Sequence, residues 1–264
     1  MTESEYIFTN SKFDSEFKRL QLLEKVLDPA SRSQLLATGL TAGWKCLEVG
    51  AGAGSMMNWM SEVVGTSGKV VAIDVDTRFI KDTSLSNVEA IEADINQIAL
   101  ADSFDLIHAR NILIHLIDYR AILNKMLGLL KPKGWLVVEE PDFSAIRFIS
   151  GTQSECHAVE RVNKAICQMF TSQGKDYTLG IKLPPLLQQL GLQQLWVNND
   201  VPISVGGSDI ATMMKLSALQ LSEKYKATGI ATDEDIQTYC QFAENSTSWG
   251  IFVATVGVSG QKPL

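Results

Sequence analysis

The sequence KCLEVGAGAGS, residues 45–55, decides the fold of this chain. It begins as a short apolar run typical of a buried strand and continues into three alternating glycines, Gly50, Gly52 and Gly54. From Met56 onward, apolar residues recur at helical spacing. Glycines between a strand and a helix let backbone N–H groups approach a ligand closely, and the first helical turn adds partial positive charge. The pattern predicts a strand, a tight turn and a helix, although a turn that binds nothing would look the same.

Acidic residues at the ends of the next two predicted strands indicate a ligand for this turn. One strand ends at Asp74, about twenty positions after Gly54, where a βαβ unit places an acid that binds ribose hydroxyls. Val75 follows it directly. The other strand leads to Asp94 and Ile95, which suit an adenine because the carboxylate accepts from the exocyclic amine and the aliphatic side chain covers the ring. These strand ends predict an adenosine-containing ligand.

Two other classes of nucleotide-binding protein are disfavoured. A dinucleotide fingerprint needs a glycine or alanine at the position of Ser55, counted from Gly50. None of the five tyrosines is followed four positions later by a lysine, as a short-chain dehydrogenase requires. No Gly-Lys-Ser/Thr sequence is present either, which argues against a nucleoside triphosphatase. The choice between NAD and S-adenosylmethionine therefore favours S-adenosylmethionine.

Over residues 15–141 the chain resembles the class I S-adenosylmethionine-dependent methyltransferases. The motifs that carry the resemblance are LEVGAGAG at 47–54, VAID at 71–74, EAD at 92–94, SFDLIHAR at 103–110 and LLKPKGWLVVEE at 129–140. In the last of these, Lys133 replaces the usual first glycine, and we expect this to affect only the turn. The resemblance implies a doubly wound, mostly parallel seven-stranded α/β sheet, a Rossmann-like fold whose last strand enters antiparallel.

The resemblance also implies how the cofactor binds. We expect Glu48 near the ammonium group, either directly or by bracing the glycine loop. Ala109 and Arg110 should pass the methionine end through their backbone carbonyls, and the Arg110 side chain could equally be a surface cation. The expected cofactor set is Glu48, Gly50, Ala51, Gly52, Gly54, Asp74, Val75, Asp94, Ile95, Ala109 and Arg110.

The implied reaction is in-line displacement of the methyl group from a sulfonium, for which alignment of the reactants matters most. A hydroxyl nucleophile would also need a base, and an amine would need only to arrive deprotonated. An aromatic carbon would need an electron-donating ring and a later proton acceptor. The sequence leaves all three open. The candidate catalytic residues are His115, which matches a histidine often found after strand 4 in the family, and Glu140. His115 could instead be structural, His108 is expected to be packed, and His157 is a weaker candidate.

Composition limits the remaining possibilities. A chain of 264 residues can form one domain with a large core and a modest appendage. A formal net charge of −7 gives no electrostatic footprint for nucleic acid. No apolar run approaches membrane-spanning length, and the acidic N-terminus lacks the features of a signal peptide, so we expect a cytoplasmic protein. No metal site is expected, and homodimerisation is a hypothesis.

The predicted organisation has four parts. Residues 1–40 form N-terminal helices, broken at Asp28-Pro29, with Tyr6 and Phe8 as a candidate lid. Residues 41–141 form the cofactor-binding core. Residues 142–192 and 206–245 form a helical cap with helices near 153–173, 181–190, 208–226 and 232–244. Residues 193–205 and 246–264 supply the final strands, expected at 194–205 and 249–258.

The cap should select the substrate. Its apolar residues could line a pocket or form ordinary core; they are Met169, Phe170, Tyr177, Met213, Met214 and Leu216. An apolar cap favours a small apolar or aromatic substrate, as in secondary metabolism. The Asn/Asp-Pro-Pro-Tyr signature of DNA and some protein methyltransferases is absent after strand 4. Two alternatives stay open: an enzyme that uses bound S-adenosylmethionine for rearrangement or cyclisation, and a regulatory protein that binds it without catalysis.

Overall fold

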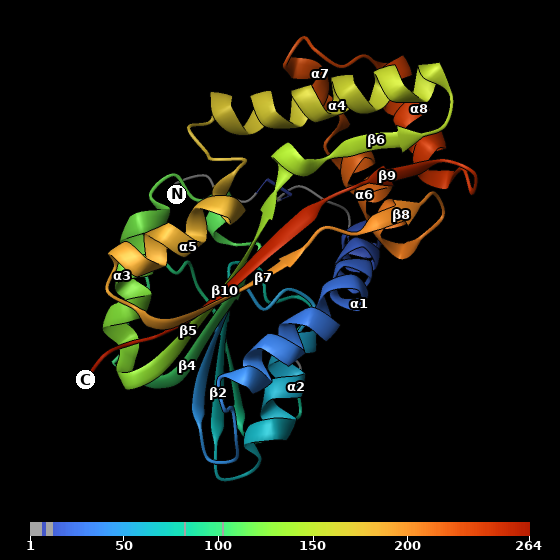
Figure 1. Cartoon of the computed structure of the whole chain (residues 1–264). Coiled ribbons are helices and arrows are strands. Elements are labelled where there is room, and N and C mark those ends of the chain that lie inside the picture. Colours follow the sequence, from blue (N-terminus) through green and yellow to red (C-terminus); the bar gives the residue numbers. More distant parts are fainter. Residues whose placement is uncertain (1–6, 9–12, 82, 102) are drawn as a thin grey trace. The chain divides into compact units, whose positions relative to one another are not determined.

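The structure is a computed structural model that describes residues 7–8, 13–81, 83–101 and 103–264, so Tyr6 lies outside the described residues. Its main sheet has seven strands in the order β3-β2-β1-β4-β5-β10-β7 (Figure 1). The pairs from β3 to β5 are all parallel, which confirms the predicted doubly wound, mostly parallel α/β fold. The strands are β1 Lys45–Val49, β2 Lys69–Asp74, β3 Val88–Glu92, β4 Phe104–Arg110, β5 Leu130–Asp142, β7 Gln193–Asp200 and β10 Ala254–Gln261.

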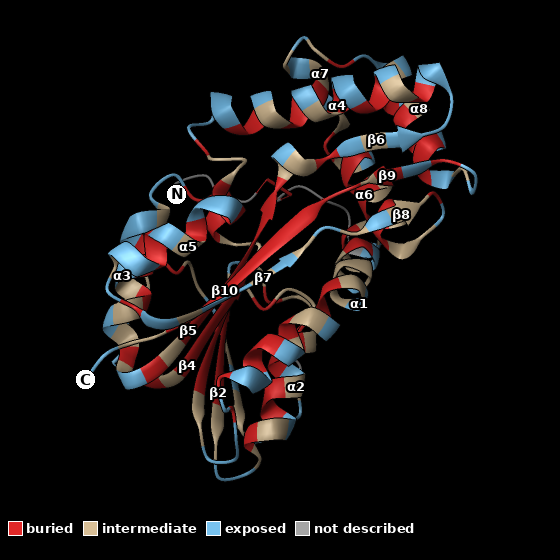
Figure 2. Cartoon of the chain, viewed as in Figure 1, coloured by how far each residue is buried: buried red, intermediate tan, exposed pale blue. Residues whose placement is uncertain are grey.

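The central strands are near-continuous apolar runs, as expected where both faces of a parallel sheet are covered. Figure 2 shows β4, β5 and β10 largely in the colour of buried residues. The helical segments of this part of the fold lie before β1, between β1 and β2, between β4 and β5 and before β7, and long crossovers of this kind let neighbouring strands run parallel. These segments are α1 Phe13–Ala37, α2 Ser55–Val64, the short 3₁₀ helix η1 Leu113–His115, α3 Tyr119–Leu129 and α5 Leu179–Gln189.

The chain divides into two compact units. One contains Leu27–Glu140, Gly180–Asn198 and Val256–Leu264, and therefore most of the seven-stranded sheet. The other contains Met1–Val26, Pro141–Leu179 and Asn199–Thr255. It holds a three-stranded sheet in the order β6-β9-β8. Its elements are η2 Phe143–Ala145, β6 Arg147–Ser150, α4 Gln153–Ser172, β8 Ile203–Val205, α6 Asp209–Gln220, α7 Ser222–Ala227, α8 Asp233–Glu244 and β9 Trp249–Ile251.

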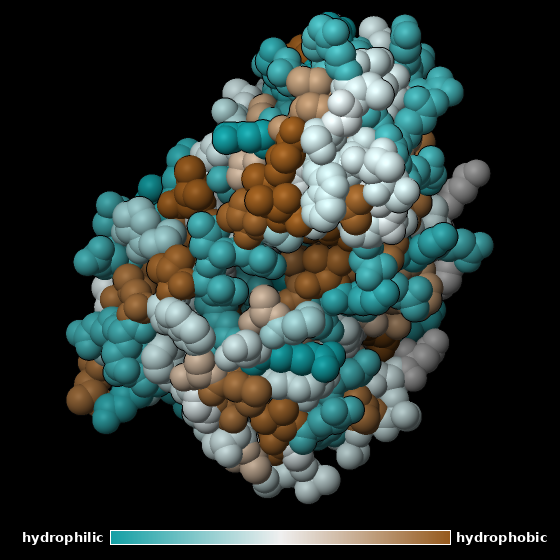
Figure 3. Space-filling model, turned by 45° about the vertical axis from the view of Figure 1, so that its right-hand side comes forward, coloured by the Kyte–Doolittle hydropathy of each residue, from teal (hydrophilic) through white to brown (hydrophobic). Residues whose placement is uncertain are grey.

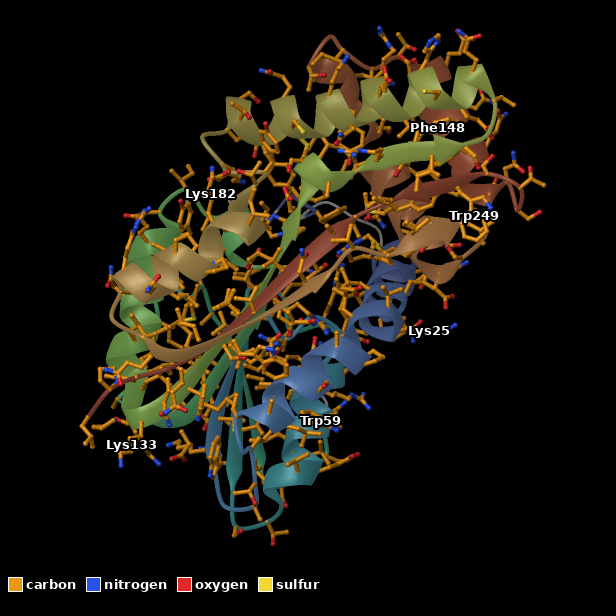
Figure 4. The ribbon with its side chains drawn as sticks, in the orientation of Figure 1. Lys25, Trp59, Lys133, Phe148, Lys182 and Trp249 are labelled. Carbon is orange, nitrogen blue, oxygen red and sulfur yellow. The ribbon has the colours of Figure 1, made fainter. Side chains whose placement is uncertain are left out.

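The second unit has its own aromatic core. The ring of Phe242 on α8 lies 5.8 Å from that of Phe148 on β6 (labelled in Figure 4) and 5.2 Å from that of Phe252. Phe170 stacks on Phe143 at 5.3 Å. Most of the apolar cap residues singled out from the sequence are buried in this way, while two are half-buried. Buried are Met169, Phe170, Met213 and Met214, and half-buried are Tyr177 and Leu216.

The predicted break at Asp28-Pro29 is wrong, because α1 is one continuous helix that contains Pro29. Proline removes a backbone N–H and usually ends a helix. Here the side chain of Asp28 is anchored by ion pairs with Arg110 and Arg32, and Leu27 and Leu35 on the same helix are buried. These contacts fix the helix on both sides of the proline.

Two predicted strands each prove to be two strands in different sheets. The run 194–205 is divided between β7 and β8, because Val201 and Pro202 leave the ladder, where proline cannot donate a hydrogen bond. The run 249–258 is likewise divided between β9 and β10 at Phe252 and Val253, whose side chains are buried. The predicted helix 208–226 is also interrupted, at Leu221 between α6 and α7.

Lys133, near the start of β5, occupies a position suited to glycine. Lys133 has φ of +63°, a conformation that glycine adopts without strain. Its N–H donates to the carbonyl of Lys262 at 3.0 Å, and its carbonyl accepts from Gln261 at 3.0 Å. Figure 4 labels Lys133. The hydrogen bonds hold the residue in its left-handed conformation.

Some apolar side chains reach the surface, visible as brown areas on the face shown in Figure 3. Ile117, Ile181 and Ile203 are each more than half exposed. Single exposed apolar residues are ordinary on a protein surface. No helix in the described part of the chain is both long and apolar enough to cross a membrane.

Candidate cofactor site

The glycine loop connects β1 to α2. Gly50, Gly52 and Gly54 have φ of +77°, +57° and +94°, a region that side-chain-bearing residues rarely adopt. The N–H of Gly50 donates to the carbonyl of Ile73 at 2.7 Å, which ties the loop to β2. A Cβ on Gly50 would lie 1.9 Å from Ile112 Cδ1, so the loop also fits closely against the segment that follows β4. Ala51 is buried within the loop.

Asp74 lies at the end of β2 and contacts the same loop. Its Oδ2 accepts from the N–H of Gly52 at 2.8 Å, and its Oδ1 accepts from the N–H of Asp76 at 3.0 Å. Burial raises the pKa of Asp74 to about 6, against the opposing effect of these hydrogen bonds. Val75 beside it is 43% exposed. The predicted loop and the predicted ribose-binding acid therefore meet at one edge of the sheet.

Asp94 and Ile95 follow β3, the strand next to β2. The N–H of Ala93 donates to the carbonyl of Asp74 at 2.9 Å, so the two strand ends are joined. Asp94 Oδ1 accepts from the N–H and the side-chain amide of Asn96, both at 2.8 Å, in a tight turn. Ile95 is buried. The residues predicted to bind adenine thus follow the strand that pairs with the one ending at Asp74.

Glu48, at the C-terminal half of β1, is buried and bonded to a histidine. His108 on β4 lies between two carboxylates: its Nδ1 is 2.6 Å from Glu48 Oε2 and its Nε2 is 2.9 Å from Glu139 Oε1. All three side chains are buried. An ionised carboxylate only accepts hydrogen bonds and a neutral imidazole has one N–H, so the geometry calls for a protonated ring. His108 is packed, as expected, and is also charged.

The pKa directions agree with this geometry. Burial lowers the pKa of His108, but the charges of Glu48 and Glu139 and the hydrogen bonds to them outweigh it and raise the pKa to about 9. Burial would raise the pKa of Glu139, but the hydrogen bond and charge of His108, with those of Arg110 and Ser31, lower it. The buried ring of His108 is therefore protonated and bonds to Glu48, two residues before the glycine loop.

The alternative of Arg110 as a surface cation is wrong. Its side chain is only 7% exposed; Nη1 donates to the hydroxyl of Ser31 at 2.8 Å and Nη2 to Asp28 Oδ1 at 3.0 Å. The reason is that Arg110 ends β4 opposite Glu139 on β5, and α1 supplies the two oxygen acceptors. Ala109 is buried in the same strand.

Glu140 holds the segment that carries His115. Its buried carboxylate accepts from three consecutive backbone N–H groups, those of Ile112, Leu113 and Ile114, at 3.0, 2.8 and 3.1 Å. Burial raises the pKa of Glu140, and the three hydrogen bonds oppose that rise. His115 closes this short 3₁₀ helix and is 8% exposed. The structure brings the two predicted catalytic residues together, while their catalytic roles stay predictions.

We expect Glu140→Gln to destabilise the protein. A glutamine has a single carbonyl oxygen and would turn an NH₂ group toward at least one N–H donor, which should cost about 1–3 kcal/mol. Urea unfolding measures this change in the free energy of unfolding. Glu89→Gln, at an exposed glutamate paired with Lys69, is the matched control and should change little. Equal stability of the two variants would show that the three contacts of Glu140 contribute nothing.

The weaker candidate His157 lies on α4 in the other unit and is exposed. Within the described part of the chain, no group of three or more histidine, cysteine, aspartate and glutamate side chains could hold a metal ion.

Sequence reasoning missed four polar residues around the site: Asp28, Ser31, Ser55 and Glu139 as a partner of His108. A signal existed in part, because charged residues inside otherwise apolar strands must find partners. Glu48 pairs with His108 in the register of β1 and β4, and Arg110 pairs with Glu139 in that of β4 and β5. The register, however, cannot be read from one sequence.

Comparison with known proteins places the chain in a family. The fold is that of a class I S-adenosylmethionine-dependent methyltransferase. A model of the methyltransferase-domain family matches residues 40–189, more than half of the chain. The chain therefore belongs to this family, and S-adenosylmethionine is its cofactor.

Relatives agree with this assignment. Methyltransferase str2 of Strobilurus tenacellus is 25% identical over 177 residues, which are 66% of this chain and 62% of the relative. Demethylmenaquinone methyltransferase of Staphylococcus aureus is 32% identical over 108 residues, 39% of this chain and 45% of the relative. The chain thus matches less than two thirds of the length of either.

A solved structure shares the fold. The phosphoethanolamine N-methyltransferase 2 of Haemonchus contortus, in complex with phosphomonomethylethanolamine and S-adenosylhomocysteine, superimposes with a TM-score of 0.53 at 14% identity. The match covers 88% of this chain and 53% of that one.

Proposed function

We propose that this protein transfers the methyl group of S-adenosylmethionine to a small apolar or aromatic molecule. Binding of the cofactor is supported by the hydrogen bond of 2.8 Å from the N–H of Gly52 to Asp74. This bond joins the glycine loop to the acid that we expect to bind the ribose. The three positive-φ glycines also fit a ligand that approaches the backbone closely.

Each part of the cofactor has proposed partners on this chain. Asp74 accepts hydrogen bonds from the ribose hydroxyls, with Val75 alongside. Asp94 and Ile95 bind the adenine. The methionine end is bound by Glu48, by the loop Gly50, Ala51, Gly52 and Gly54, and by the backbone carbonyls of Ala109 and Arg110.

Bound S-adenosylmethionine supplies a methyl group on a sulfonium that leaves as a neutral thioether. The residues of this chain then need to align the acceptor and exclude water, and alignment alone can supply about 7–11 kcal/mol. We propose His115 as the proton acceptor for an acceptor that must lose a proton. For Glu140, which was predicted as a second catalytic group, the contacts with residues 112–114 support a positioning role for the His115 segment.

The substrate class rests on the relatives and on the composition of the cap. Demethylmenaquinone methyltransferase is named for demethylmenaquinone. Of the six apolar cap residues, Tyr177 and Leu216 are half-buried, and they are the two that we propose for contact with an apolar acceptor. We also propose that the protein acts in secondary metabolism, lies in the cytoplasm and forms a homodimer. Light scattering on the purified protein would settle the oligomeric state.

We expect His115→Ala to reduce turnover by about 10²–10⁴-fold for a hydroxyl acceptor, the usual contribution of a general base. Cofactor affinity should stay unchanged, because the proposed cofactor set does not include this residue. Steady-state kinetics and calorimetry measure the two quantities. Full turnover with the physiological acceptor would remove His115 from catalysis.

The experiment that tests methyl transfer uses cofactor labelled on the methyl group and a panel of small apolar and aromatic acceptors. We expect the label in the product together with release of S-adenosylhomocysteine. A product that is an unlabelled isomer of the acceptor would support rearrangement or cyclisation instead. Binding of the cofactor without any product across the panel and in cell extract would support the regulatory alternative.

A further inference from the structure

A continuous chain of polar side chains joins the two ends of the glycine loop. It begins at Ser55, directly after the loop, and ends at Glu48, just before it. The links are Ser55 Oγ to Asp28 Oδ1 at 3.0 Å, Arg110 Nη2 to the same oxygen at 3.0 Å, Arg110 Nη1 to Ser31 Oγ at 2.8 Å, Ser31 Oγ to Glu139 Oε2 at 2.9 Å, and His108 to Glu139 and Glu48 at 2.9 and 2.6 Å.

The charges along this chain compensate one another. Arg110 neutralises Asp28, and the protonated ring of His108 lies between Glu139 and Glu48. Buried ion pairs hold their geometry when further hydrogen bonds satisfy the remaining polar atoms. The hydroxyl of Ser31 does so here, since it accepts from Arg110 and donates to Glu139.

The chain also anchors α1 to the loop. Asp28 and Ser31 both belong to α1, and Ser55 is the first residue of α2. The guanidinium of Arg32, one turn after Asp28, lies 5.7 Å from the ring of Trp59 on α2, a residue labelled in Figure 4. Movement of α1 would therefore be transmitted to both ends of the glycine loop.

We propose that this chain fixes the glycine loop for the cofactor and that His108 is the positioning residue that holds the Glu48 carboxylate for the ammonium group at the amino-acid end. The proposal rests on the proposed cofactor orientation. His108 acts through Glu48, so its loss should weaken only those ligands that carry the amino-acid end. Asp74, by contrast, should matter for every ligand with a ribose.

Two ligands and two matched variants test this. S-adenosylhomocysteine carries the amino-acid end, and 5′-methylthioadenosine lacks it but keeps the ribose and adenine. In His108→Gln the amide nitrogen can replace Nε2 and keep the link to Glu139, but the link to Glu48 is lost. In His108→Asn the amide nitrogen can replace Nδ1 and keep the link to Glu48. The dissociation constants are measured by calorimetry.

We expect His108→Gln to raise the dissociation constant of S-adenosylhomocysteine by roughly ten- to hundredfold, the usual effect of losing a hydrogen bond to a charged group. The dissociation constant of methylthioadenosine should rise by less than about twofold. His108→Asn should stay closer to the wild type. The proposal would be overturned if His108→Gln lowered the affinity for both ligands equally. It would also be overturned if His108→Gln and His108→Asn lowered the affinity for S-adenosylhomocysteine equally. Absence of S-adenosylhomocysteine binding by the wild-type protein would instead overturn the proposed function.

A second variant covers the case in which His108→Gln does not fold. Ser31→Ala interrupts the chain between Arg110 and Glu139, two links away from Glu48, without placing a new polar group. Ser31→Ala should lower the affinity for S-adenosylhomocysteine more than the affinity for methylthioadenosine. An equal loss of affinity for the two ligands would again overturn the proposal.

Discussion

Asp74→Ala is expected to abolish measurable cofactor binding without unfolding the protein. The proposed pair of charge-assisted hydrogen bonds to the ribose contributes about 1.5–3 kcal/mol each, so affinity should fall by roughly 10²–10⁴-fold. The protein should stay folded with a modest loss of stability, because the change removes an acceptor from the N–H groups of Gly52 and Asp76 but no apolar side chain from the core. Calorimetry and thermal unfolding measure the two effects, and unchanged affinity would contradict the ribose assignment.

The pH dependence provides an internal control for the same residue. Only the ionised carboxylate accepts from both hydroxyls, and its pKa is about 6. Affinity should therefore fall as the pH drops through 6, approaching tenfold for each further unit. Because the pKa is higher in the folded protein than in the unfolded chain, protonation of this group favours the folded state and does not itself cause unfolding. Asp74→Asn should bind weakly and show no such dependence.

Gly50→Ala is expected to damage both stability and binding. Alanine at φ of +77° is strained by about 1–3 kcal/mol, and its Cβ would lie 1.9 Å from Ile112 Cδ1. Ile112 cannot move without disturbing the segment that Glu140 holds. We therefore expect a lower free energy of unfolding and a large loss of affinity for S-adenosylhomocysteine.

Gly39→Ala is the matched control for this variant. Gly39 has φ of +89°, and a Cβ there would meet no atom within 4 Å. It should show the cost of backbone strain in urea unfolding but keep the wild-type affinity. Wild-type affinity in Gly50→Ala as well would mean that the loop does not approach the cofactor.

The sequence was sufficient for those features that depend on local pattern. The alternating glycines, the acids at strand ends and the apolar runs define β1 to β5 because each depends on neighbouring residues only. Glu48, Asp74 and Asp94 were correctly placed near strand ends for the same reason.

The predictions from sequence are wrong where contacts with distant residues override the local conformational preference of the chain. Pro29 stays inside α1 because Asp28 binds Arg110, which lies on β4, far along the chain. The division of 194–205 and of 249–258 between two sheets depends on which strand each half meets. The pairing of His108 with Glu48 and Glu139 depends on sheet register, which one sequence does not reveal.

Calorimetric titration of the purified protein with S-adenosylmethionine and, separately, with NADH distinguishes the two cofactors that the glycine loop could bind. We expect S-adenosylmethionine to bind in the micromolar range and NADH not to bind. Binding of NADH alone, or of neither ligand, would contradict the assignment of the loop at residues 50–54 as the site for S-adenosylmethionine.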